Sequence, residues 1–501
     1  MIQHDLSRRL AISLTGPSDA IAVEFGDAVY DWGMLAAAGH SLNAALDAAG
    51  VEHAQAVGLA LRNRPLGYAA LVSLLAAGRS VALISPFQAT GAIASDIERL
   101  GLAAIVADAG DWSEETIAAA RSRGSAGIAL DETGWTIAAI GTSAIVRPAN
   151  DHRTMADVAV QMLTSGTTGA PKRIPLHWHS LGQAITDQGR MAAAMGEAPP
   201  GPAPEAALIQ YAPMVQLSGL YNALQAATEG RRLILMEKFS PERWINCVRS
   251  HRQHMLALPP AMMRMVMEAD PAREDLASLR AVRSGAAPLD DHTRDSFEAR
   301  YGVPVLSIYG ATEFAGPVAS WSLDDHARFS ATKRGSVGRI WADIASGRII
   351  DPDSKAQLPP DASGILHIQV GRVGEDWIPT NDLATIDADG FLFIHGRADD
   401  AINRGGFKIP PDIIADMLRR HPRVYDAAAL PLPDARLGQV PAAAVELRDG
   451  MEPVDEALLT EFLRQRLLAY QVPVRILILP TLPRTPAQKI SRPELLALFQ
   501  V

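Results

Sequence analysis

Short apolar runs alternate with helical patterns early in the chain, and this alternation constrains the fold more than any other feature. Ala56–Leu61 and Ser80–Ile84 are apolar runs of strand length, and Tyr68–Ala77 between them has the pattern of a helix. A strand–helix–strand order favours parallel strands that are covered by helices. The sequence therefore predicts an α/β fold at the N-terminus.

The length of the chain requires more than one domain. It has 501 residues, whereas single hydrophobic cores stop growing at roughly 250–300 residues. The pattern changes near Gly390, where Gly364–Val370 and Gly390–Ile394 alternate like antiparallel strands. We therefore predict a large N-terminal domain of residues 1–398 and a small α+β C-terminal domain of residues 399–501.

The C-terminal stretch carries the signals of an independent unit. Val474–Leu479 reads as a buried strand, and Ser491 and Glu494 form a capping-box pattern before a helix at Pro493–Phe499. An apolar stripe at helical spacing precedes them. The residues of the stripe are Leu458, Leu459, Phe462, Leu463 and Leu467.

Charge and cysteine content exclude several classes of protein. The net charge of −10 argues against nucleic acid as a main partner, because phosphate backbones need a clustered basic face. The single cysteine, Cys247, excludes an internal disulfide and a multi-cysteine metal cluster. The N-terminus lacks an apolar signal core, and Arg79 and Pro86 interrupt the most hydrophobic stretch, Ala69–Phe87. We expect a cytoplasmic protein without integral membrane association.

The strongest chemical signal is the segment from Met162 to Lys172. It follows a predicted strand at Val158–Leu163 and carries four hydroxyl side chains, two glycines and one lysine. Glycines let backbone N–H groups approach a polyanion, and the lysine adds charge. The order differs from the P-loop pattern, because Lys172 follows Pro171 and no Ser or Thr comes after it. The segment predicts a phosphate-binding loop; the alternative is a polar surface turn.

A second signal follows the apolar run Val303–Ile308. Tyr309 can stack on a base, Gly310 allows close approach, Thr312 can donate to a phosphate, and Glu313 offers an oxygen ligand for Mg²⁺. The alternative is a strand-end turn with an exposed glutamate. Upstream lies a small-residue turn suited to lying flat against a purine, at Ser284, Gly285, Ala286, Ala287 and Pro288.

Three further segments carry polar residues at predicted turns. Asp382 is placed after a tight turn, where it could accept from two ribose hydroxyls, although an ordinary turn residue is the alternative. The charged, glycine-flanked connector His395–Ile409 is suited to a hinge. Pro483–Ile490 is a proline-rigidified loop that presents Lys489, whose alternative is a solvated surface charge.

In this order the segments resemble the ANL superfamily, which contains acyl- and aryl-CoA synthetases, peptide-synthetase adenylation domains and luciferases. The resemblance spans nearly the whole chain. It implies an N-terminal domain of two α/β subdomains plus a small β-barrel, followed by a mobile C-terminal lid. It also implies ATP, Mg²⁺ and coenzyme A as cofactors, and a small carboxylic acid as substrate.

The resemblance further implies a role for individual residues. Lys489 bridges the carboxylate and the α-phosphate, Thr312 meets the α-phosphate, Glu313 holds Mg²⁺, and Asp399 is the hinge. Gly285–Pro288 and Tyr309 with Gly310 hold adenine, and Asp382 and Arg397 hold the ribose. The β- and γ-phosphates are gripped by Thr164, Ser165, Gly166, Thr167, Thr168, Gly169 and Lys172. The passage for coenzyme A is formed by Arg404, Gly405, Gly406 and Phe407.

The acyl pocket implied by the resemblance contains Gln216, Leu217, Ser218, Gly219, Gly310, Phe314 and Ala315. Gln216 stands where many relatives have histidine or an aromatic residue, so the pocket should have some polar capacity; the alternative is an ordinary helix-start glutamine. Asn381 replaces a glycine, which is tolerable because Asn accepts a left-handed conformation. Gln488 replaces the common glycine before Lys489.

The predicted function is activation of a carboxylic acid to an acyl-AMP, with release of pyrophosphate, and then thioester formation with coenzyme A. An amide synthetase or a carrier-protein ligase shares the first half-reaction and differs in the acceptor. A P-loop ATPase or kinase would instead release orthophosphate or a phosphorylated product. Lys172, Glu313, Asp382, Arg397 and Lys489 together speak against an inactive binding protein. The sequence leaves the acid and homodimerisation open.

Overall fold

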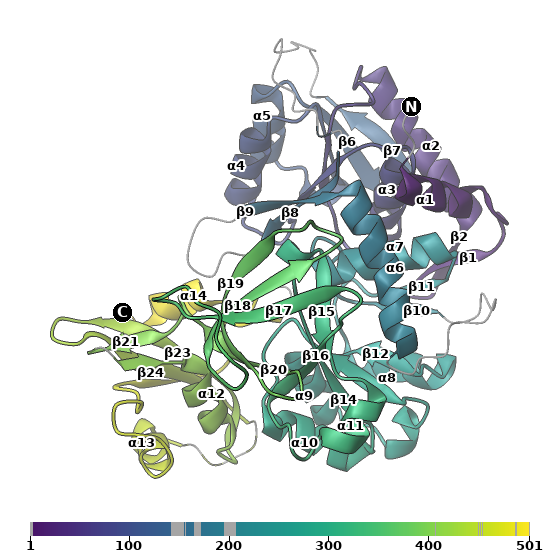
Figure 1. The fold of residues 1–501 in the computed structure, drawn as a ribbon. Coiled ribbons are helices and arrows are strands. Elements are labelled where there is room, and N and C mark those ends of the chain that lie inside the picture. The colour runs from purple at the N-terminus through teal and green to yellow at the C-terminus, as the bar shows by residue number, and fades with distance from the viewer. Residues whose placement is uncertain are drawn as a thin grey trace. The chain divides into compact units, whose positions relative to one another are not determined.

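The fold is taken from a computed structural model (Figure 1), which describes residues 4–141, 155, 157–164, 172–194, 207–405, 407–448, 450, 452, 454–485 and 488–499. The chain divides into two compact units. The first comprises Met1–His254 and Ala311–Gly316, and the second Met255–Gly310 and Pro317–Val501.

The first unit has the alternating strands and helices of an α/β fold. Its strands are β1 (Ile21–Phe25), β2 (Ala28–Asp31), β3 (Val57–Ala60), β4 (Val81–Ile84), β5 (Ala104–Asp108), β6 (Ala126–Asp131), β7 (Thr136–Ile140), β8 (Val158–Thr164), β9 (Lys172–His177), β10 (Leu208–Gln210) and β11 (Leu233–Leu235). Its helices are α1 (Asp5–Thr15), α2 (Trp32–Ala48), α3 (Pro65–Ala76), α4 (Thr90–Leu100), α5 (Glu114–Ser122), α6 (Trp178–Ala194), α7 (Leu217–Glu229) and α8 (Pro241–His251), with short 3₁₀ turns η1 (Ala109–Asp111) and η3 (Thr312–Phe314).

The main sheet of the first unit is mostly parallel. Its order is β7-β6-β5-β3-β4-β8-β9, and only the edge strands β7 and β9 run antiparallel to their neighbours. Every residue of β3 and β4 is buried, as expected for strands with helices on both faces. The predicted strands at Ala56–Leu61 and Ser80–Ile84 and the helix between them are confirmed. A second, smaller sheet has the order β10-β11-β1-β2.

The central helix α3 shows how this sequence sets an element boundary. Pro65 stands in its first turn, where a missing N–H costs nothing. The carboxylate of Glu132 accepts from the Leu66 N–H at 2.7 Å, so it binds one of the donors that a helix start leaves unpaired. Burial raises the pKa of Glu132 to about 7, so this acceptor is partly protonated near neutral pH.

The second unit combines parallel and antiparallel strands. Its strands are β12 (Met255–Ala257), β13 (Ala281–Ser284), β14 (Val305–Ala311), β15 (Gly316–Ser320), β16 (Ser336–Ile340), β17 (Ala345–Ile350), β18 (Gly364–Val370), β19 (Trp377–Ile386), β20 (Phe391–Arg397), β21 (Ile402–Arg404), β22 (Phe407–Ile409), β23 (Val424–Asp434), β24 (Gly438–Leu447) and β25 (Ile476–Leu479). Its helices are α9 (Pro260–Glu268), α10 (Asp291–Tyr301), α11 (Leu323–Phe329), α12 (Pro411–Arg419), α13 (Glu456–Arg464) and α14 (Arg492–Leu498), with the 3₁₀ turn η2 (Arg273–Leu276).

One long sheet carries the strands that hold the candidate site of the second unit. Its order is β12-β13-β14-β15-β16-β20-β19-β18-β17, with β12 to β14 parallel and β16 to β20 antiparallel. The predicted strand at Gly364–Val370 is β18. The predicted strand at Gly390–Ile394 begins one residue later and runs on to Arg397.

The residues after β20 form a sheet of order β22-β21-β24-β23, with β25 beside β24. We call this C-terminal part the lid, after the role that the resemblance implies. Leu459 and Leu463 of α13 are buried in its core, whereas Leu458 is 46% exposed and therefore does not belong to the predicted apolar stripe. The predicted capping box is wrong, because the Ser491 hydroxyl donates to the Glu494 carboxylate at 2.8 Å and caps no backbone N–H. The helix itself is α14, one residue earlier than predicted.

Cys247 is buried within α8, and burial raises the pKa of its thiol. None of the helices in the part of the chain that the structure describes combines the length and apolar character that crossing a lipid bilayer requires.

Candidate active site

The predicted adenine turn lies along strand β14. Ser284, the last residue of β13, pairs with Ser307 of β14 in parallel register. A Cβ on Gly285 would stand 3.1 Å from the carbonyl oxygen of Ile308, so the turn packs closely on β14 just before Tyr309. Ala286 has a φ of +66°, a conformation that is strained for a residue with a side chain. Such strain is often kept where backbone must meet a ligand.

Tyr309 and Asp382 contact each other directly. The Tyr309 hydroxyl donates to Oδ2 of Asp382, and Asp382 on β19 lies opposite Arg397 on β20. Burial and the neighbouring Asp382 carboxylate raise the pKa of Tyr309, so the phenol remains a donor. Three residues that the sequence assigns to adenine and ribose are therefore brought together on β14, β19 and β20.

Two predictions about this region are wrong. Asp382 lies inside the strand Trp377–Ile386 and not after a tight turn. Asn381 is not left-handed, since it is absent from the residues with positive φ. Its side chain instead donates to Oδ2 of Asp399 at 3.1 Å. The amide thus replaces a glycine by making a contact to the predicted hinge residue, which the sequence pattern alone did not indicate.

The predicted hinge is held by ion pairs. Arg397 donates from Nε to Oδ1 of Asp399 at 3.0 Å, and Arg492 pairs with Asp400, which is buried. Burial favours the neutral acid at Asp399, but the hydrogen bonds from Arg397 and Asn381 prevail and lower its pKa. Arg397 therefore joins the predicted ribose position to the predicted hinge.

The phosphate-loop residues lie in the first unit. Thr164, at the end of β8, pairs with Lys172, at the start of β9, so the two ends of the predicted loop are adjacent in an antiparallel pair. Lys172 is exposed. Ser165, Gly166, Thr167, Thr168 and Gly169 lie outside the described residues.

Helix α7 contacts one of the predicted acyl-pocket residues of the first unit, Ala315. Tyr221 of α7 donates its hydroxyl to the Ala315 carbonyl at 2.6 Å, and Ala315 has a φ of +49°. Glu313 is exposed, whereas Phe314 is only 1% exposed and belongs to the core. Gly219 has no room for a side chain, because a Cβ would stand 2.2 Å from the Pro213 carbonyl oxygen.

The side chains available as metal ligands suit Mg²⁺. Among the described residues, no three His, Cys, Asp or Glu side chains form a group that could hold a metal by themselves. Glu313 offers a single exposed carboxylate. Mg²⁺ characteristically takes one or two carboxylates and completes its shell with water and substrate phosphates. Glu313 therefore fits an ion that arrives with a nucleotide.

The lid presents its predicted residues on two loops. Lys489 is exposed, yet the protein atoms around its amine lower its pKa by desolvation. Its carbonyl accepts from the Thr485 N–H at 2.7 Å, and Gln488 has a φ of +61°. The family glycine is thus replaced by a residue held in the conformation that glycine prefers.

The second loop is the hairpin of β21 and β22. Arg404 pairs with Phe407 across it, Gly405 has a φ of +55°, and Gly406 lies outside the described residues. Phe407 is 58% exposed and stacks on Tyr470 with ring centroids 4.7 Å apart. The hairpin therefore offers an exposed aromatic face.

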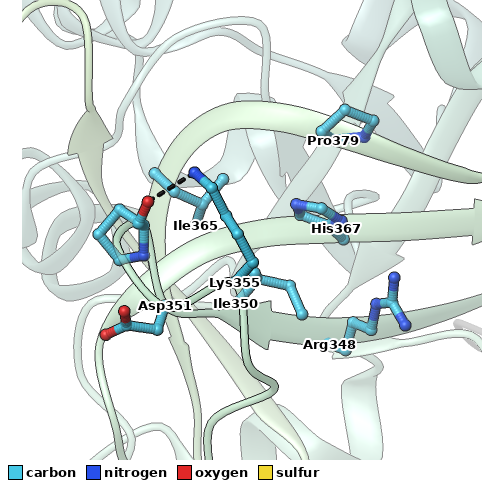
Figure 2. A pocket seen from close by; sticks show the side chains of 8 residues that line it. Arg348, Ile350, Asp351, Lys355, Ile365, His367 and Pro379 are labelled. Carbon is cyan, nitrogen blue, oxygen red and sulfur yellow. Dashed lines mark hydrogen bonds between the residues drawn. The ribbon is translucent and has the colours of Figure 1, made fainter.

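A pocket of about 360 Å³ lies on strands β17, β18 and β19 and shares no residue with the predicted site (Figure 2). The Lys355 amine donates to the Pro352 carbonyl at 2.6 Å, and Arg348 lies 4.1 Å above the Trp377 ring. These contacts already engage both cations. The remaining lining residues are Ile350, Asp351, Ile365, His367 and Pro379.

The fold places the chain in a known structural class. It matches ATP-bound MatB from Rhodopseudomonas palustris with a TM-score of 0.81 and 21% identity, over 99% of both chains. It matches the amide bond synthetase McbA from Marinactinospora thermotolerans with a TM-score of 0.78 and 24% identity, over 99% of this chain and 100% of that one. The predicted fold class, an α/β N-terminal domain with a small C-terminal domain, is confirmed.

The family follows from the sequence models. The AMP-binding enzyme family matches residues 11–373, and the AMP-binding enzyme C-terminal domain matches residues 414–489. The chain belongs to the AMP-binding enzyme family, which confirms the resemblance to the ANL superfamily. It is 29% identical over 377 residues to 4-coumarate--CoA ligase-like 5 of Oryza sativa subsp. japonica, covering 74% of this chain and 67% of that protein. Across the first such relatives, the matched region spans 61–67% of their length.

Proposed function

We propose that this protein activates a carboxylic acid with ATP to an acyl-AMP and then transfers the acyl group to coenzyme A. The observation that carries the proposal is the contact of Tyr309 with Asp382, opposite Arg397. These residues come from separate motifs, and a base with its ribose is a ligand that needs an aromatic ring and a carboxylate side by side. The membership of the AMP-binding family and the CoA-ligase relatives support the same activity.

In the first half-reaction, a carboxylate oxygen attacks the α-phosphorus of ATP and pyrophosphate leaves. Two anions must approach each other, so cations are needed where charge accumulates. Lys489 supplies one beside the α-phosphate, and Lys172 supplies another beside the leaving phosphates. Glu313 would hold Mg²⁺, which neutralises phosphate charge when it is bound. Asp382 and Arg397 fix the ribose, so the α-phosphate is presented to the acid.

In the second half-reaction, the thiol of coenzyme A attacks the acyl carbon and AMP leaves with the bonding electrons. We propose that rotation about Asp399 withdraws Lys489 and brings the Arg404–Phe407 hairpin inward. Gly406 would leave room for the thin pantetheine arm, and Phe407 offers an apolar contact to it. Gln216 and Ser218 give the acyl pocket some polar capacity.

An amide synthetase is the second candidate function, because the amide bond synthetase McbA shares the fold over nearly the full length of this chain. It uses the same first half-reaction and an amine as acceptor. The sequence also predicts a cytoplasmic location. Neither half-reaction depends on this location or on whether the protein forms a homodimer.

The deciding experiment is an assay of pyrophosphate and AMP release over a panel of carboxylic acids, each with no acceptor, with coenzyme A or with amines. We expect pyrophosphate and AMP with no orthophosphate, and turnover that coenzyme A accelerates. Acceleration by amines alone would favour the amide synthetase, and orthophosphate release would exclude both.

Lys489→Ala divides the two steps. It should reduce adenylate formation by about 100-fold or more, as expected when a charge that stabilises a transition state is removed. Thioester formation from synthetic acyl-AMP should largely survive. Equal loss of both steps would refute the division of labour between the two lid faces.

A further inference from the structure

Asp426 is a buried carboxylate that holds three arginines. It lies on β23 with 0% exposure. Arg419 donates to its Oδ1 at 2.8 Å, and Arg484 and Arg264 donate to its Oδ2 at 2.7 and 2.9 Å. Burial alone would favour the neutral acid, but the three guanidinium groups hold the pKa of Asp426 well below its usual range. A buried charge such as this one must keep at least one partner of opposite charge.

The three arginines come from three different segments of the second unit. Arg419 ends α12 and Arg484 begins the Lys489 loop, so both belong to the lid. Arg264 belongs to α9, 162 residues before Asp426. The same two elements also bring Tyr425 on β23 near Glu268 on α9, where Tyr425 opposes the rise that burial causes in the pKa of Glu268. Asp426 therefore connects the lid to helix α9, which precedes strands β13 to β20 of the long sheet in the chain.

Arg484 also sets the shape of the Lys489 loop. Its guanidinium donates to the Gln488 carbonyl at 3.3 Å as well as to Asp426, and its backbone pairs with Ile490. The loop closes through the Thr485 N–H and the Lys489 carbonyl. One side chain thus fixes the residue that precedes Lys489 to a carboxylate in the lid core.

The contact to Arg264 can be broken without leaving a buried charge unpaired. Without it, Asp426 keeps Arg419 and Arg484, and Arg264 keeps Asp290 at 3.7 Å. Arg419 also pairs with Asp416, and Arg484 lies 3.4 Å from Glu446. Asp426 and the three arginines therefore each keep a partner of opposite charge whether the contact between Arg264 and Asp426 is formed or broken. A buried ion pair that forms and separates requires this.

We propose that Asp426 and Arg484 are positioning residues for Lys489, and that Arg264 is a releasable latch that holds the lid in the pose suited to adenylate formation. This inference rests on the proposed function of Lys489. It predicts that the latch favours the first half-reaction and has to open before the second.

The kinetic test compares Arg264→Gln, Arg484→Gln and Arg484→Lys in both half-reactions. Arg264→Gln and Arg484→Gln should lower pyrophosphate release roughly 10–100-fold, the range for hydrogen bonds to charged groups. Thioester formation from synthetic acyl-AMP should stay within about twofold. Arg484→Lys should recover part of the first step, because it restores a positive charge beside Asp426. Arg464→Gln, an exposed pair with Glu461, is the matched control and should change neither step.

A second measurement needs no substrate. Amide hydrogen exchange at Thr485 and Gln488 should rise in Arg484→Gln, while the amides of β23 and β24 stay protected and show that the lid is folded. Unchanged exchange at both amides, or equal loss of both half-reactions in Arg264→Gln, would overturn the proposal. If the wild-type protein catalyses neither half-reaction, the proposed function fails, and the exchange result still decides whether Arg484 orders the loop.

Discussion

At the scale of single residues, the contact of Tyr309 with Asp382 makes one carboxylate serve two purposes. It accepts from the phenol of Tyr309, and in the proposed function it also accepts from the ribose hydroxyls. Arg397 similarly faces Asp382 across the strands while it binds Asp399. Changes at these residues should therefore affect nucleotide binding and the hinge together.

Asp382→Asn tests the ribose role. The amide keeps the shape but loses the charge, so the KM for ATP should rise roughly 10–100-fold, as expected for hydrogen bonds to a charged group. Initial rates of pyrophosphate release at varied ATP measure this. Asp353→Asn, in an exposed turn, serves as the control. An unchanged KM for ATP would remove Asp382 from the nucleotide site.

Gln488 tests the strain in the Lys489 loop. A β-branched residue at a φ of +61° is disfavoured more strongly than Gln, so Gln488→Val should destabilise the loop by about 1–2 kcal/mol. Gln488→Gly relieves the strain but adds freedom to the unfolded chain, so it should change stability by less than about 1 kcal/mol. Urea unfolding of the lid compares the two variants. Equal effects would show that φ at this position is not constrained.

At the scale of elements, glycine has opposite roles in two neighbouring helices. Gly219 in α7 is forced by the Pro213 carbonyl, whereas the space around Gly189 in α6 is open. Helix α7 needs its glycine for close packing, whereas α6 tolerates a glycine that packing does not require.

This difference predicts alanine substitutions of opposite sign. Gly189→Ala should stabilise the protein by about 0.5–1 kcal/mol through helix propensity. Gly219→Ala should destabilise it by about 1–3 kcal/mol, since the added Cβ must displace backbone. Thermal unfolding measures both changes. Two substitutions with the same sign would contradict the packing at Pro213.

Continuous apolar runs made several elements predictable. β3 and β4 lie within one residue of the predicted strands, because strands buried on both faces are unbroken apolar runs. β18 matches the strand that its alternating pattern predicts. Polar strands were harder to recognise. The sequence predicts a turn before Asp382, because Pro379, Thr380 and Asn381 are turn-type residues, whereas they lie within strand β19.

The candidate site was predictable only where its residues lie in short motifs. Tyr309, Asp382, Arg397 and Lys489 each stand in a recognisable segment. The partners of Asp426 gave no such signal, because Arg264 is 162 residues away and a single aspartate carries no pattern. Arg484 lay within a segment already singled out, yet its contacts depend on tertiary structure.

At the scale of the whole molecule, the buried carboxyl of Glu132 links stability to pH. Its pKa is raised from 4.5 to about 7 by burial, so the folded state holds a proton that the unfolded chain releases near pH 4.5. Between these values the folded state binds more protons. The free energy of unfolding must therefore fall as pH rises through this window.

Glu132→Gln should remove this pH-dependent loss of the free energy of unfolding. The glutamine side-chain oxygen can still accept from the Leu66 N–H. Each pKa unit corresponds to about 1.4 kcal/mol, so the gain above pH 7 is at most about 3 kcal/mol and vanishes below pH 4.5. Urea unfolding at intervals from pH 5 to 8 compares the variant with the wild type. Parallel curves for the two proteins would show that Glu132 does not titrate in this range.

Cys247 has a practical consequence for following the lid in solution. It is the only cysteine in the chain, it is buried, and its raised pKa keeps it a poorly nucleophilic thiol. A cysteine introduced on the exposed surface of α13 would therefore accept a fluorophore with little background labelling. A second introduced cysteine would complete a donor–acceptor pair, so single molecules could report opening and closing without a cysteine-free background first being engineered.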